Sequence, residues 1–142
     1  MNLRTAINIM LFLITAVAFF HISIILKIVP YDITWGGRLK NDSEMYIFES
    51  LSIIINILLI ITLLIKGNYI KQMLPSRMVD IILWIFLILF GVNTIGNLFA
   101  NTNLEKLFAV LTLASSILIW IILKGKNKHA FPNKKIANND NP

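Results

Sequence analysis

The chain has no cysteine among its 142 residues, and only 14% of its residues are charged. The lack of cysteine excludes disulfide bonds, thiolate catalysis, iron–sulfur clusters and zinc sites built on cysteine. The low share of charged residues is also unusual for a soluble protein, because an ordinary soluble domain carries about 25% charged and about 45–50% apolar residues. Here 57% of the residues are hydrophobic.

This composition predicts that lipid, and not water, surrounds much of the chain. The mean hydropathy is +0.77. A soluble domain near 150 residues buries only about 70% of the surface that its unfolded chain exposes, so too much apolar surface would remain in water. The composition therefore argues against water-soluble enzymes, nucleic-acid-binding domains and disordered proteins.

Four apolar runs approach the length of about 20 residues that a helix needs to cross a bilayer. They cover residues 6–26, 45–65, 79–100 and 107–123. None shows the alternation of a β-strand, and backbone amides in lipid must be paired within the segment, so we expect helices. Short connections favour antiparallel neighbours. The sequence predicts an all-α polytopic membrane protein, with an antiparallel four-helix transmembrane bundle over residues 1–123 and a basic polar tail over 124–142.

The first run resembles a secretory signal peptide in two respects. Arg4 precedes it, and Ala16-Val17-Ala18 has the small residues of a cleavage site. The apolar sequence continues beyond that site to Leu26. We therefore expect an uncleaved first span.

Lysine and arginine are unequally divided between the two sides of the predicted bundle. One side holds nine of them: Arg4, Lys66, Lys71, Arg77, Lys124, Lys126, Lys128, Lys134 and Lys135. The other side holds four: Lys27, Arg38, Lys40 and Lys106. The positive-inside rule predicts a multi-pass protein of the cell membrane with cytoplasmic N- and C-termini. The tail is expected to contact lipid and not nucleic acid, which would need aromatic platforms among the charges.

Polar side chains inside the apolar runs are costly in lipid and need partners. His21 lies late in the first run. The second and third runs each carry a polar stripe at helical spacing, Glu49, Ser52 and Asn56 in one, and Asn93, Asn97 and Asn101 in the other. Gly96 near the second stripe is expected to allow close approach of another helix. In the antiparallel topology these groups gather in the outer half of the bundle, which predicts a polar pocket there.

The connection between the first two runs holds Trp35, Gly36-Gly37 and Arg38. Trp35 is expected at the membrane interface, where aromatic belts occur. The segment is either an interfacial hairpin or a lid in which Arg38 meets Glu49 or an anionic ligand. Because a nearby cation keeps a carboxylate ionised, we expect Glu49 to pair with Lys27 or Arg38.

His21 and Glu49 also form a candidate proton-handling pair. They are the residues that would carry catalysis if the protein were an enzyme. No metal site is expected, because a third ligand and the usual histidine spacing are missing, and no cofactor is expected. The candidate ligand-binding residues are His21, Trp35, Arg38, Glu49, Ser52, Asn56, Asn93 and Asn97.

Four short phrases carry a family resemblance: His21-Ile22, Phe48-Glu49, Phe90-Gly91-Val92-Asn93-Thr94 and Glu105-Lys106-Leu107. In these the chain resembles the four-helix (EXPERA) domain of emopamil-binding protein and the sigma-2 receptor. As a whole it resembles small, uncharacterised four-span proteins of bacterial membranes. The domain's late first-helix acid is absent here, and Asn93 replaces its third-helix histidine. The resemblance implies a polar intramembrane pocket for sterol-like or cationic amphiphilic ligands, with Glu49 in its wall.

Three functions remain open from the sequence. The first is a membrane protein that binds or moves a small amphiphilic or lipid-like molecule. The second is an accessory or assembly subunit, whose polar stripes contact a membrane protein partner or a second copy of the chain. The third is a membrane isomerase-type enzyme that transfers a proton through His21 and Glu49. Membrane lipid is a partner in every case.

Overall fold

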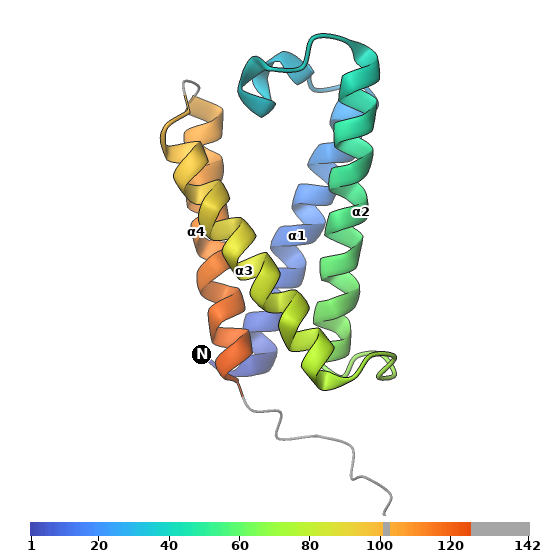
Figure 1. Cartoon of the computed structure of the whole chain (residues 1–142), viewed down its shortest axis with the longest axis vertical. Helices are drawn as coiled ribbons and strands as arrows, with labels where there is room; N and C mark the ends of the chain where they lie inside the picture. Colours follow the sequence, from blue (N-terminus) through green and yellow to red (C-terminus); the bar gives the residue numbers. More distant parts are fainter. Residues whose placement is uncertain (101–102, 126–142) are drawn as a thin grey trace, which may run out of the picture.

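The fold is an all-α bundle of four long helices, as the sequence predicts (Figure 1). The computed structural model describes residues 1–100 and 103–125. The helices are α1 (Leu3–Ile25), α2 (Asp42–Lys66), α3 (Ser76–Leu98) and α4 (Asn103–Lys124). Two short 3₁₀ turns, η1 (Tyr31–Ile33) and η2 (Trp35–Gly37), lie in the connection between α1 and α2. The described residues contain no β-strand.

All four helices are long and apolar enough to cross a membrane. Their most apolar windows have mean hydropathies between 2.2 and 2.4, and only 22–28% of each window is buried inside the protein. Most apolar side chains therefore face outward, where water would be unfavourable and lipid is the suitable solvent. The chain is a multi-pass membrane protein.

The helices begin three or four residues before the predicted spans, and polar side chains cap two of them. Asn2 accepts a hydrogen bond from the Thr5 backbone nitrogen, and Asn41 accepts one from the Glu44 backbone nitrogen. α3 starts directly after Pro75 and ends at Leu98, two residues before the predicted end. Residues 126–142 of the predicted tail lie outside the described residues, as does Asn101.

The helices form two hairpins that are joined most firmly at one end. α1 packs mainly on α2, and α3 packs mainly on α4. The buried apolar core lies toward the N-terminus of α1, which is the lower end in Figure 1. Its fully buried members include Ala6, Ile7, Met10, Leu59, Leu63, Leu83, Ile119 and Ile122. We call this the core end of the bundle, and the opposite end, which carries the α1–α2 connection, the loop end.

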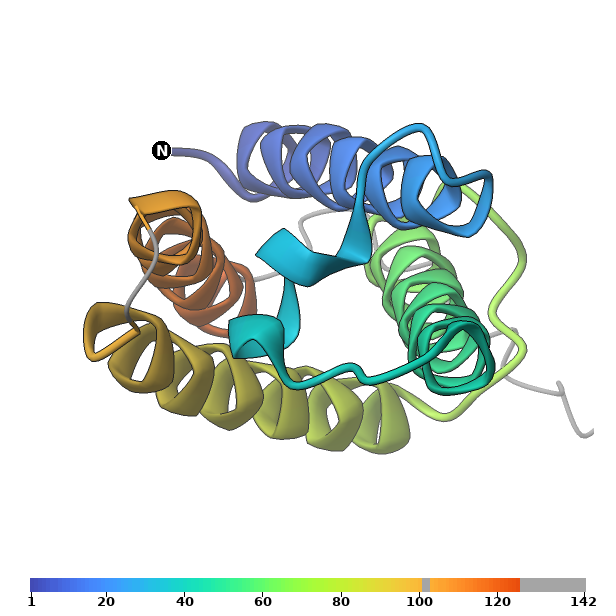
Figure 2. The same ribbon diagram turned by 90° about the horizontal axis from the view of Figure 1, so that it is seen from above.

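The α1–α2 connection folds back over the loop end. Seen from above, η1 and η2 lie between the helices (Figure 2). A small apolar cluster of Ile24, Leu39 and Met45 holds the base of the connection. Lys27 Nζ also lies 2.5 Å from Asp42 Oδ2, which ties the end of α1 to the start of α2. This hydrogen bond to Asp42 raises the pKa of Lys27.

The expectation that Gly96 allows a close helix approach is wrong. A Cβ added at Gly96 would meet no atom within 4 Å, and the same holds for Gly91. Both glycines therefore lie beside open space within the described structure. In contrast, a Cβ at Gly67 would lie 2.7 Å from the Tyr69 ring.

Replacing Gly96 by alanine should raise the free energy of unfolding by about 0.5–1 kcal/mol, because alanine is the better helix former. Gly67→Ala should lower it, since the new methyl group would push against Tyr69. Thermal unfolding in detergent would measure both changes. A lower melting temperature for Gly96→Ala would show that a neighbouring helix packs closely on this residue.

Candidate functional site

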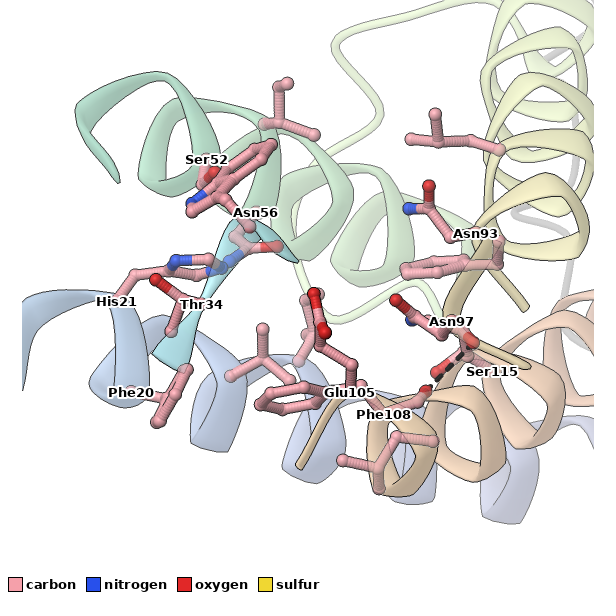
Figure 3. A pocket seen from close by; sticks show the side chains of 18 of the residues that line it. Phe20, His21, Thr34, Ser52, Asn56, Asn93, Asn97, Glu105, Phe108 and Ser115 are labelled. Carbon is pink, nitrogen blue, oxygen red and sulfur yellow. Dashed lines mark hydrogen bonds between the residues drawn. The ribbon is translucent and has the colours of Figure 1, made fainter. Parts of the chain in front are cut away.

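A cavity of about 440 Å³ lies among the four helices at the loop end (Figure 3). Its size falls within the range of about 300–1,000 Å³ typical of small-molecule sites. The two turns of the connection contribute as well, because Thr34 and Trp35 belong to its lining. The lining is largely apolar, with Ile14, Val17, Phe20, Ile24, Ile55, Phe86, Leu89, Phe90, Phe108 and Leu111.

Helical spacing explains how the sequence directs these side chains into one space. Ile14, Val17, His21 and Ile24 recur at intervals of three and four on α1, so they share one face. On α2, Glu49, Ser52 and Asn56 share the face that lines the cavity. The polar stripes read from the sequence therefore face the cavity.

Glu49 is the most deeply buried charged residue of the site, with no exposed surface. Both of its carboxylate oxygens have partners: Oε2 lies 2.5 Å from His21 Nδ1, and Oε1 accepts a hydrogen bond of 2.8 Å from Trp35 Nε1. A buried carboxylate is tolerated only when such bonds replace its hydration. Glu49 thus joins α2 to α1 and to the connection.

The expected pairing of Glu49 with Lys27 or Arg38 is wrong. Lys27 pairs with Asp42 instead, and both side chains are about half exposed. Arg38 is exposed and lies outside the cavity lining. The physical reason is that His21 and Trp35 occupy both oxygens of Glu49, while the salt bridge at the base of the connection holds Lys27.

Three asparagines line the cavity, one on α2 and two on α3. Asn56 is only 7% exposed, and its Nδ2 has no hydrogen-bond partner among the described residues. Asn93 and Asn97 lie on α3, across the cavity from His21 and Asn56 (Figure 3). Ser52 bonds the Phe48 carbonyl of its own helix. Of the eight ligand-binding candidates, the structure brings seven together at the cavity, and Arg38 is the exception.

Several cavity residues were missed in the candidate set. Glu105 is only 8% exposed and lies in the first turn of α4. It precedes the fourth apolar run, so the apolar pattern does not indicate that it faces the site. Thr112 and Ser115 complete the polar wall on α4, and Thr112 also accepts a hydrogen bond of 2.9 Å from Thr94 of α3. The spacing of three residues between Thr112 and Ser115 places them on one face of a helix, and this spacing is visible in the sequence.

The charge of the lining is one-sided. Among the described residues of the lining, Glu49 and Glu105 contribute two carboxyl groups, His21 is the only basic side chain, and there is no lysine or arginine. The described residues hold no group of three histidine, cysteine, aspartate or glutamate side chains that would suit a metal ion. The arrangement is therefore suited to hold an apolar body together with a polar group that is not anionic.

Comparisons with models of protein families, with curated proteins and with solved structures find no match to this chain. The resemblance to the domain of emopamil-binding protein thus stays a prediction. The function must be argued from the cavity itself.

Replacing Glu49 by alanine should lower the free energy of unfolding by about 2–4 kcal/mol, because it leaves the His21 and Trp35 donors without their acceptor in a buried place. Glu49→Gln should cost less, since its amide oxygen still accepts one of the two bonds. Chemical unfolding in mixed micelles would measure both losses.

Asp32→Asn provides the control, since it removes an exposed carboxylate at the same end of the bundle. Equal stability of Glu49→Ala and the wild type would mean that the contacts of Glu49 contribute nothing to the fold.

Proposed function

We propose that this protein binds a small amphiphilic molecule in the cavity at the loop end. The observation that carries the proposal is the combination of an apolar cavity with Asn56, a buried amide whose nitrogen has no partner among the described residues. An unpaired buried donor costs about 1–3 kcal/mol. A ligand that brings an acceptor to this depth would recover that free energy.

The distribution of side chains supports an amphiphile over a purely apolar molecule. His21, Trp35 and Glu49 lie toward the loop end, and Glu105 lies in the first turn of α4 at the same end. Ile14 and Phe86 lie further toward the core end. We infer that the polar end of the ligand lies near the carboxyl groups and that its apolar body extends toward the middle of the bundle.

The charged residues of the lining also support a preference for a cationic ligand over an anionic one. Glu49 and Glu105 both disfavour an anion, and the described residues of the lining include no lysine or arginine that would attract one. The aromatic rings of Phe20 and Phe108 are able to contact a cation through their faces. A cationic head group is therefore favoured over an anionic one.

A second candidate function is the transfer of a proton to a lipid-soluble substrate. The distance of 2.5 Å between His21 Nδ1 and Glu49 Oε2 supports it, because a carboxylate on one ring nitrogen orients an imidazole whose other nitrogen is then able to exchange a proton. The role of an accessory subunit is less well supported, since the polar stripes of α2 and α3 line a cavity and not an outer face.

We further propose that both termini lie in the cytoplasm, so that the cavity occupies the outer half of the membrane. Nine of the thirteen lysine and arginine residues support this orientation. A reporter enzyme fused after Pro142 should be active only in the cytoplasm. Activity confined to the outer side would reverse the orientation.

Binding can be tested with two probes that share a ten-carbon acyl chain, decanoylcholine and decanoate. The ester carbonyl of decanoylcholine supplies the acceptor that the nitrogen of Asn56 lacks. Calorimetry on the protein in lipid nanodiscs, corrected with empty nanodiscs, should show saturable binding that is about ten-fold tighter for the cation. Ser115→Phe, which places a ring in the cavity, should abolish this binding.

Leu113→Phe is the matched control, because it adds the same ring to an exposed position of α4 and should leave the affinity unchanged. Binding that survives in Ser115→Phe, or the absence of saturable binding in the wild type, would contradict the proposed function. Tighter binding of decanoate would contradict only the preference for a cation.

A further inference from the structure

We propose that residues 32–38 form a lid over the loop-end mouth of the cavity, held closed by the hydrogen bond from Trp35 to Glu49. This inference rests on the proposed binding function, because it assigns the control of access to the same cavity. Thr34 and Trp35 belong to the lid and also line the cavity. Figure 2 shows η1 and η2 lying across the space between the helices.

The two stems of the connection, residues 27–31 before the lid and 39–41 after it, are held by contacts of their own. Lys27 bonds Asp42 below the lid, and Leu39 is buried against Ile24 and Met45 directly after it. These contacts involve no residue of the lid, so opening of the lid leaves them in place. The segment between the stems is therefore the part that is able to move without unfolding a helix.

Trp35 provides the attachment of the lid to the bundle. Its Nε1 donates to Glu49 Oε1 at 2.8 Å, and among the described residues this is the one side-chain hydrogen bond from the lid to a helix. The Trp35 ring also packs against Phe48, with 5.1 Å between the ring centroids. Glu49 is a fixed anchor, because His21 holds its other oxygen.

The backbone of Trp35 is strained in this closed position. Its φ is +53°, in the left-handed region that a bulky side chain rarely adopts. Such a conformation persists only where surrounding contacts hold it. Breaking the bond to Glu49 would remove one of the contacts that hold this conformation, so the strain favours opening. Gly37, at φ +66°, accepts the same region without penalty and suits a hinge.

The lid can be tested without a ligand, because the chain has no cysteine of its own. Ser115→Cys places one thiol in the cavity, and a membrane-impermeant methanethiosulfonate reagent measures its access in lipid nanodiscs. Trp35→Phe retains a ring but removes the donor to Glu49. In the double variant Ser115→Cys/Trp35→Phe, the reagent should label the cavity thiol about ten-fold faster than in the single variant Ser115→Cys.

Ser43→Cys, an exposed position at the same end, is the control and should be labelled at the same rate with and without Trp35→Phe. If Trp35→Phe fails to fold, Phe48→Leu takes its place, since it weakens the ring contact from an exposed position and should also speed the labelling. Unchanged labelling of the cavity thiol in a folded variant overturns the lid. That result leaves the binding of decanoylcholine to be judged separately.

Discussion

The structure depends on the burial of one carboxylate in a protein whose solvent offers no hydrogen bonds. Glu49 has no exposed surface, so every bond that stabilises its charge must come from the chain. His21 supplies one bond from α1, and Trp35 supplies the other from the connection. This requirement fixes the register of α1 against α2 at the loop end and folds the connection back between the helices.

The two ends of the bundle differ in how tightly their interiors are packed, because they carry different side chains on their inward faces. At the core end, leucine and isoleucine of all four helices fill the interior. At the loop end, the inward faces combine an apolar majority with amides, hydroxyls and carboxyl groups, and they enclose a cavity instead of a packed core. The packed core end stabilises the bundle that contains this cavity.

Much of the fold was predictable, and the site only in part. Lipid imposes a length and an apolar composition on each span, and the predicted span 45–65 accordingly lies within α2. The helices α1 and α2 begin before their apolar runs, at the caps Asn2 and Asn41. Helical spacing identified Glu49, Ser52 and Asn56 as one face. Spacing does not reveal which of several groups within reach becomes a partner, and so the partner of Glu49 was wrongly expected to be Lys27 or Arg38. Glu105 was missed because α4 begins earlier than its apolar run.

Glu49 and Asn56 differ in whether their polar atoms have hydrogen-bond partners, and this difference distinguishes a residue that stabilises the fold from one that is available to a ligand. The two residues share one face of α2, seven residues and so about 10 Å apart. Glu49 has a partner on each oxygen, so its role in the closed structure is complete without a ligand. The nitrogen of Asn56 has no partner among the described residues, although an apolar side chain of similar size would fill this place without that penalty. The nitrogen of Asn56 therefore makes no hydrogen bond that stabilises the described fold, and the proposed ligand would supply its partner.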